Sequence, residues 1–250
     1  MSICIKNLTI SYQHIPAVHH VNADFDFGEA WAIVGPNGAG KSSLLKAIIG
    51  QVKCDTGEIV LSNLKRCDIA YLPQISEIDR LQPMTVFELV ATGLWFEIGF
   101  FGGTNKEQKQ RIMHALEQVE MQQNANRLIK QLSDGQFQRV LFARMLVQKA
   151  KFLLLDEPFN AIDENTTQIL INILSGCLKN NQGIVAVLHD NNIVKTHFSH
   201  TLLLAREKVA AGKTQDVLTQ DNLAKAKLFS QDIFDTDNWC ADIVEHHHYE

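Results

Sequence analysis

Short, mostly apolar runs separated by polar or glycine-containing stretches recur along the chain. Residues 3–10 alternate roughly between apolar and polar positions, which is typical of a strand with one buried face. Most of the other runs have little alternation, as expected of strands that are buried on both faces of a sheet. They lie at residues 31–34, 57–61, 68–72, 152–155, 184–188 and 201–204.

Helical periodicity follows two of these predicted strands. Apolar residues stand at helical spacing over 44–49 and again over 169–178, and Gly50 marks the expected end of the first helix. Apolar strands that alternate with helices predict an α/β fold with a mostly parallel sheet.

Residues 83–148 differ from the rest because they are predominantly helical in character. Residues 85–88 and 104–107 both fit the capping-box pattern that opens a helix. The second of these helices is expected to bury one apolar face. That face carries Ile112, Leu116 and Val119.

These patterns predict a single domain over residues 1–250. Its core would be formed by residues 1–82 and 149–250, and residues 83–148 would form an inserted helical subdomain. Residues 236–250 form a polar tail for which disorder is the expectation.

Composition narrows the classes of function. The 250 residues are 46% hydrophobic and carry a formal net charge of −5, so the basic excess typical of nucleic-acid binding is absent from the sequence. No apolar run approaches the roughly 20 residues needed to span a bilayer. The five cysteines are scattered, which indicates reduced thiols in a cytosol rather than a disulfide framework.

Residues 35–42 fit the phosphate-loop pattern of spaced glycines followed by lysine and serine. Glycines let successive N–H groups face inward, and the helix that follows adds the positive end of its dipole. Lys41 would neutralise the β- and γ-phosphates of a nucleotide, and Ser42 would supply a hydroxyl ligand to Mg²⁺. The alternative is a glycine-rich turn that binds nothing. The expected nucleotide contacts are Gly35, Pro36, Asn37, Gly38, Ala39, Gly40, Lys41, Ser42 and Ser43.

Two acidic residues end the apolar run at 152–155. A strand delivers such carboxylates to the carboxyl edge of a parallel sheet, where phosphates bind. Asp156 therefore suits Mg²⁺ coordination, and Glu157 suits general-base work on an attacking water. Taken alone, the pair could also be the solvated start of a loop.

The segment Leu132-Ser133-Asp134-Gly135-Gln136 resembles the signature Leu-Ser-Gly-Gly-Gln of ABC transporter nucleotide-binding subunits. It stands between the phosphate loop and Asp156, as in that family. The resemblance implies a P-loop ATPase fold with an N-terminal antiparallel β portion, and a helical subdomain that carries the signature. It also implies a homodimer in which Ser133, Gly135 and Gln136 of one subunit contact the ATP held by the other. Asp134 departs from the family pattern and is not expected to contact nucleotide.

Other positions match the same family residue by residue. Gln74 matches the glutamine that reaches Mg²⁺ and the water, and His189 matches the histidine that contacts the γ-phosphate. Asp163 matches a loop residue at the dimer interface, and Tyr12 matches the aromatic residue that stacks on adenine. A structural histidine and an ordinary surface tyrosine are the alternatives for His189 and Tyr12.

Finer similarity points to ATPases of bacterial zinc and manganese importers. The segments at 136–144, 156–163 and 186–190 resemble theirs, and so does the aromatic-rich segment at 93–101. The aromatic-rich segment at 93–101 could contact a permease or belong to the core of the helical insert. The resemblance implies a cytoplasmic protein, peripheral to the membrane, that works with an integral permease and indirectly with an extracytoplasmic binding protein.

Other cargoes and other functions stay open at this stage. Because cargo selection resides in other subunits, an importer of iron chelate, haem or cobalamin fits the same sequence. A non-transport ABC ATPase acting on DNA or ribosomes fits less well, because the chain is acidic and has neither a second motor domain nor a long coiled-coil insertion. In the tail, Cys240 and the histidines of 245–250 could sense metal, although a disordered polar terminus is the simpler expectation.

Overall fold

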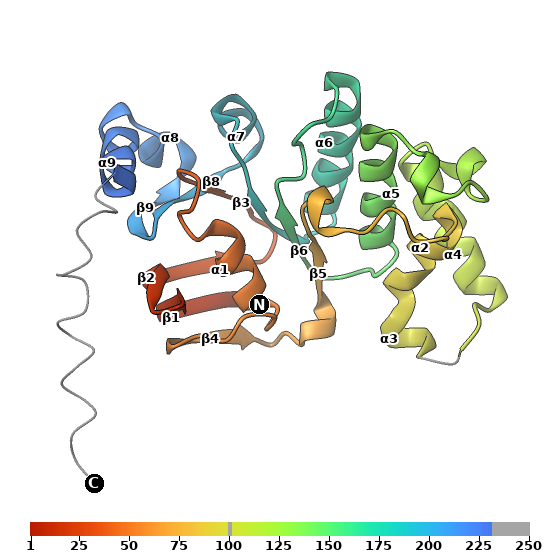
Figure 1. Ribbon diagram of the computed structural model, residues 1–250, viewed down its shortest axis with the longest axis horizontal. Coiled ribbons are helices and arrows are strands. Elements are labelled where there is room, and N and C mark those ends of the chain that lie inside the picture. The colour runs from red at the N-terminus through yellow and green to blue at the C-terminus, as the bar shows by residue number, and fades with distance from the viewer. Residues whose placement is uncertain (100–101, 232–250) are drawn as a thin grey trace, which may run out of the picture.

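A mostly parallel sheet runs through the centre of the protein (Figure 1). The computed structural model describes residues 1–99 and 102–231, so the tail at 236–250 and two residues of the aromatic segment, Phe100 and Phe101, lie outside the described residues. The strand order is β5-β6-β7-β3-β8-β9, and only the pairing of β8 with β9 is antiparallel within this described sheet. The bounds are β3 Ala30–Val34, β5 Ile69–Leu72, β6 Phe152–Asp156, β7 Gly183–Val187, β8 His200–Ala205 and β9 Glu207–Lys213.

A smaller antiparallel sheet lies beside it, toward the lower left in Figure 1. In this sheet β1 (Ser2–Tyr12) pairs with β2 (Ile15–Asp26) on one side and with β4 (Thr56–Ser62) on the other. The expected N-terminal antiparallel portion is therefore confirmed. Strand β2 and strand β9 were not predicted from the sequence.

Helices follow the parallel strands, as the predicted alternation requires. Helix α1 follows β3 and begins at Lys41. Helix α6 follows β6 and is the longest helix among the described residues. The bounds are α1 Lys41–Ile48, α6 Glu164–Lys179, α7 Asn191–His197, α8 Thr214–Val217 and α9 Gln220–Gln231.

The helical insert leaves the sheet after β5 and returns to it at β6. Its helices gather at one end of the molecule, at the right of Figure 1. Thr85 caps the first helix in a capping box with Glu88, as predicted. The second box is shifted by one residue from the prediction, because Asn105 caps that helix and pairs with Gln108. The bounds are α2 Val86–Ala91, α3 Trp95–Ile98, α4 Lys106–Gln118 and α5 Asp134–Leu146.

The two faces of the parallel sheet are buried in two different apolar cores. Along β3, Ala32 and Val34 face the core that also contains the apolar side chains of α2, α4 and α5. Trp31 and Ile33 face the other core, which is shared with α1 and the antiparallel sheet. Because strand side chains alternate between faces, each central strand contributes to both cores. This explains the absence of polar positions in the central runs.

The α/β fold class expected from the sequence is confirmed. Among the described residues, the helices are too short or too polar to cross a membrane.

Candidate functional site: the phosphate loop and its surroundings

The phosphate loop connects β3 to α1 at the carboxyl edge of the parallel sheet. Gly40 caps α1 in the left-handed conformation, with φ of 82°. A Cβ atom at this position would lie 2.1 Å from the Ala17 carbonyl oxygen. Glycine is therefore required here both by the backbone angle and by the close approach of another segment.

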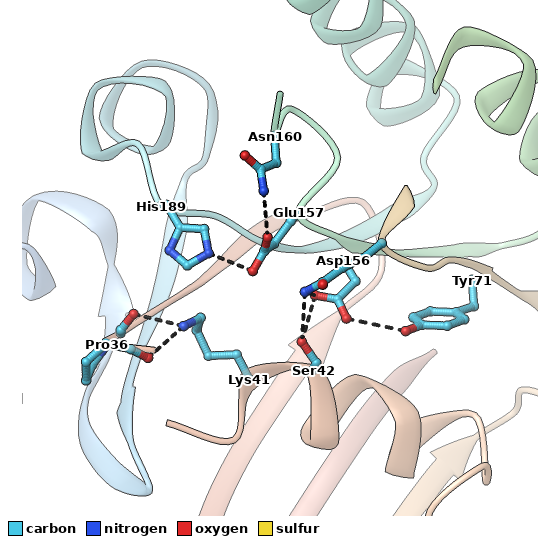
Figure 2. A network of polar contacts seen from close by, with 10 residues as sticks. Pro36, Lys41, Ser42, Tyr71, Asp156, Glu157, Asn160 and His189 are labelled. Carbon is cyan, nitrogen blue, oxygen red and sulfur yellow. Dashed lines mark hydrogen bonds and ion pairs between the residues drawn. The ribbon is translucent and has the colours of Figure 1, made fainter. Parts of the chain in front are cut away.

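Lys41 turns back onto its own loop. Its Nζ donates to the carbonyl oxygens of Gly35 (2.9 Å) and Pro36 (2.8 Å), and the residue is only 6% exposed (Figure 2). Burial lowers the pKa of Lys41, although Glu157 and Asp156 oppose that shift. The ammonium group is thus positioned beside the loop where an anion would be neutralised.

Asp156, at the end of β6, is fully buried and forms the centre of a polar cluster. Ser42 Oγ donates to Asp156 Oδ1 (3.0 Å), and Gln74 Nε2 lies 3.5 Å from both of these oxygens. Burial raises the pKa of Asp156, although the hydrogen bonds from Ser42 and Gln74 oppose the shift. Tyr71 Oη donates to the other carboxylate oxygen (3.4 Å) and was not predicted as a site residue.

The chemistry of this cluster suits a hard divalent cation. It brings together a hydroxyl and a carboxylate, whose oxygens are ligands that Mg²⁺ prefers. An amide can also supply an oxygen ligand, but in this structure Gln74 directs its Nε2 toward the cluster. The charge of a buried carboxylate is also unfavourable until a cation compensates it. Ser42, Gln74 and Asp156, the residues predicted for Mg²⁺, therefore meet in one place.

Glu157 lies one residue further along and is held by two side chains. Its Oε1 lies 2.7 Å from His189 Nε2, and its Oε2 accepts from Asn160 Nδ2 (3.1 Å) (Figure 2). The backbone of Glu157 is left-handed, with φ of 50°, a conformation that is uncommon outside glycine and that concentrates at functional sites. Asn160 was not predicted as a site residue, because its role depends on this local turn and no sequence pattern marks it.

A cleft of about 690 Å³ lies between the phosphate loop and Glu157, within the size range of small-ligand sites. Tyr12 stands at its rim, 49% exposed, with its Oη 3.2 Å from Ser43 Oγ. An exposed ring beside the loop is placed where an adenine could stack on it. The lining residues are Tyr12, Ala17, Asn37, Gly38, Ala39, Gly40, Lys41, Ser42, Ser43, Gln74, Glu157, Asn160 and His189.

The signature segment forms the N-terminus of α5. Ser133 caps this helix in a capping box with Gln136, at 3.2 Å in each direction. Gly135 lies against the start of α6, since a Cβ there would be 3.1 Å from Asp163 Oδ2. Asp163 in turn caps α6 by accepting from the backbone of Thr166 (2.9 Å).

The signature and the phosphate loop are not brought together within one copy of the chain. In the described part of the chain, Ser133, Gly135 and Gln136 are absent from the lining of the phosphate-loop cleft, and so is Asp163. The structure thus assembles one group of predicted residues around the cleft and leaves the second group outside its lining.

More than half of the chain matches a known protein family. The profile of the family described as ABC transporter matches residues 18–160, from the middle of β2 to the turn that contains Asn160. The chain belongs to the ABC transporter family. As a member of this family it is an ATP-binding enzyme that hydrolyses ATP.

Curated members of the ABC transporter family resemble the chain over most of its length. It is 40% identical over 223 residues to the manganese transport system ATP-binding protein MntB of Listeria innocua, covering 88% of this chain and 93% of that protein. It is 35% identical over 229 residues to the zinc transport system ATP-binding protein TroB of Treponema pallidum, covering 90% and 86%. The resemblance to manganese and zinc transport ATPases is therefore confirmed.

Solved ABC structures share the fold. A dimeric bacterial ABC transporter cassette superimposes with a TM-score of 0.75 at 29% identity, covering 85% of this chain and 98% of that one. The same cassette was also solved as a dimer in a post-hydrolysis state with ADP and Pi, with a TM-score of 0.76.

Proposed function

We propose that this chain is the ATPase subunit of an ABC importer for a divalent transition metal, manganese or zinc. The observation that carries the catalytic part is the position of Glu157, which faces the phosphate-loop cleft beside His189 and next to the Asp156 cluster. The cargo is supported by the names of the relatives, which are manganese and zinc transport ATP-binding proteins.

The residues of the cleft have different roles in ATP binding and hydrolysis. Lys41 and the inward N–H groups of the phosphate loop bind the triphosphate, and Tyr12 stacks on the adenine. When Mg²⁺ is bound through Ser42, Asp156 and Gln74, it neutralises phosphate charge. Glu157 orients a water and takes its proton as general base.

His189 and Asn160 keep the Glu157 carboxylate turned toward the cleft. A general base must be within hydrogen-bond reach of the proton that it abstracts, so fixing its orientation raises the fraction of productive encounters. His189 also stands at the cleft, where it can contact the γ-phosphate.

A second copy of the chain completes each site in this proposal. Ser133, Gly135 and Gln136 lie outside their own cleft, so they would cap the γ-phosphate bound by a partner, with Asp163 at the same interface. The dimeric form of a related cassette supports this arrangement. ATP bound between two copies would hold them together, and hydrolysis would release them.

The helical insert would connect this motor to an integral membrane permease at the cytoplasmic face of the membrane. Large apolar side chains of α3 and of the loop before the helical insert are exposed, which supports a protein contact at this surface. They are Leu81 (81%), Trp95 (51%) and Phe96 (78%). We also propose the division into a core at 1–82 and 149–250 and a helical subdomain at 83–148. A substrate-binding protein outside the cytoplasm would deliver cargo to the permease.

The Glu157→Gln variant tests the catalytic proposal. It should bind ATP and Mg²⁺, fail to hydrolyse, and accumulate as a dimer in size-exclusion chromatography with multi-angle light scattering. Glu164→Gln, at the exposed start of α6, is the matched control and should hydrolyse ATP as the wild type does. A Glu157→Gln protein that retains turnover would rule out Glu157 as the base.

The cargo requires the complete transporter. The chain would be co-expressed with its permease, reconstituted in proteoliposomes, and assayed for ATP-dependent movement of Mn²⁺ and Zn²⁺. Transport of an iron chelate with no movement of either free ion would favour the chelate importer instead.

A further inference from the structure

Arg80 joins two segments that surround the proposed site. It follows Gln74 in the same loop, and its guanidinium reaches the N-terminus of α5. Its Nη1 is paired with the Asp134 carboxylate, and its Nη2 donates to the Leu132 carbonyl oxygen. The guanidinium carbon also lies 4.6 Å from the centre of the Phe137 ring. Three contacts of different kinds therefore fix the orientation of this side chain.

Asp134 is the residue that replaces a glycine of the signature. Its side chain is 59% exposed and stands between Ser133 and Gly135. It also lines a small pocket of about 220 Å³ together with Gln74 and Glu157. In the sandwich dimer the signature segment that contains Asp134 would meet the triphosphate bound by a second copy. An uncompensated carboxylate there would repel that triphosphate.

We propose that Arg80 is a positioning residue that neutralises Asp134 and thereby makes this variant signature compatible with the triphosphate of a second copy. The inference rests on the proposed sandwich dimer. Arginine suits the task because its charge is permanent and its planar fork can engage the carboxylate and the Leu132 carbonyl at once. Since Arg80 shares a loop with Gln74, a shift of this loop would also change the charge presented at Ser133.

A purely structural role for the pair makes a different prediction. An acidic residue such as Asp134 in the first turn of a helix stabilises the helix dipole with or without a nucleotide. Arg80 could then simply attach the loop that contains Gln74 to α5. Loss of Arg80 would then be harmful whether or not position 134 carries a charge. With charge compensation, loss of Arg80 is harmful only while the Asp134 carboxylate is present.

The experiment is a double-mutant cycle in the Glu157→Gln background, with the dimer dissociation constant measured by sedimentation velocity in ATP and Mg²⁺. Arg80→Ala should raise this constant roughly tenfold, and adding Asp134→Asn should bring it back to within about threefold of the parent. The Arg80→Ala defect should also shrink as KCl is raised, because salt screens the repulsion. The matched control is Arg111→Ala, which loses a comparable ion pair with Glu97 and should leave the constant unchanged.

Two outcomes overturn the inference while leaving the sandwich dimer intact. One is an Arg80→Ala protein that dimerises as tightly as its parent, and the other is a double variant as weak as Arg80→Ala alone. A parent that stays monomeric with ATP removes the dimer itself, and the inference falls with it. If Arg80→Ala lowers the melting temperature more than Arg111→Ala does, Arg80→Gln replaces it, because glutamine removes the charge and keeps a donor for Leu132.

Discussion

Glu157 Oε1 lies 2.7 Å from His189 Nε2, although the two residues follow different strands, β6 and β7. These strands are parallel neighbours, so their carboxyl ends deliver both side chains to the same edge of the sheet. Asn160, in the turn after Glu157, donates to the other carboxylate oxygen. The carboxylate is therefore oriented by the sheet on one side and by its own turn on the other.

The His189 contact predicts a selective loss of turnover. His189→Ala should lower kcat by about 100-fold or more, because the carboxylate loses a partner and the γ-phosphate loses a contact. ATP affinity should change much less, since the phosphate loop stays intact. Steady-state phosphate release and ATP titration measure the two quantities. His197→Ala, at the other end of α7, is the control, and an equal loss in both variants would contradict the assignment.

The Asn160 contact predicts a smaller effect of the same kind. Asn160→Ala should reduce kcat by about five- to tenfold with little change in KM, because it removes one neutral donor to the carboxylate. Asn160→Ser keeps a hydroxyl donor and should recover part of the loss. The control Asn172→Ala removes an amide on α6 that accepts from Gln168 and should be neutral. A rise in KM without a change in kcat would indicate a binding role instead.

Lys41 and Lys46 offer a matched comparison within α1. Lys41→Ala should weaken ATP binding by about 100-fold, because it removes the charge beside the phosphate loop. Lys46 is paired with Glu77 at 2.6 Å and is absent from the described lining of the phosphate-loop cleft, so Lys46→Ala should bind ATP normally. Isothermal titration calorimetry provides both affinities. Unchanged affinity after the Lys41 substitution would be incompatible with the proposed nucleotide site.

Asp156 should show a trade-off between stability and activity. Burial raises its pKa above the ordinary 3.8, so the folded protein holds this proton more tightly than the unfolded chain does. The free energy of unfolding therefore falls as the pH rises from about 4 through the folded pKa, and the ionised carboxylate is a net cost at neutral pH.

The Asp156→Asn variant should accordingly melt a few degrees higher than the wild type in EDTA at pH 8 and should lose Mg²⁺-dependent hydrolysis. The stability gain should shrink toward pH 4. Asp216→Asn, on the exposed side of α8, is the control and should change neither quantity. A variant that is less stable than the wild type at pH 8 without metal would contradict the argument.

The sequence was informative wherever a short segment is enough to identify a structural or functional feature. The phosphate loop, the capping box at Thr85 and the two acids after β6 are local patterns, and each lies where it was expected. Strand β2 was missed because its alternation changes phase. Pro16 and Val18 are buried, and after His20, which has φ of 48°, the buried positions become Val21, Ala23 and Phe25.

The contacts that sequence analysis missed join residues that lie far apart along the chain. Tyr71 reaches Asp156 across neighbouring strands, and Arg80 reaches Asp134 from a loop 54 residues earlier. Such pairs depend on how the sheet and the helical insert pack, and a single sequence does not contain that information. The unusual Asp134 could be recognised as a departure from the signature, but its compensating partner became visible only in the fold.

The alternation of the central strands between two apolar cores limits how the chain can be rebuilt. Excising the helical insert would remove α5, which packs against β5 and α6, and would expose apolar residues of the core that these elements share. An exchange of this insert with a relative's would succeed only if the sheet-facing residues were exchanged with it. Substitutions meant to alter the proposed permease contact are therefore better confined to exposed positions such as Trp95 and Phe96, which contribute little to either core.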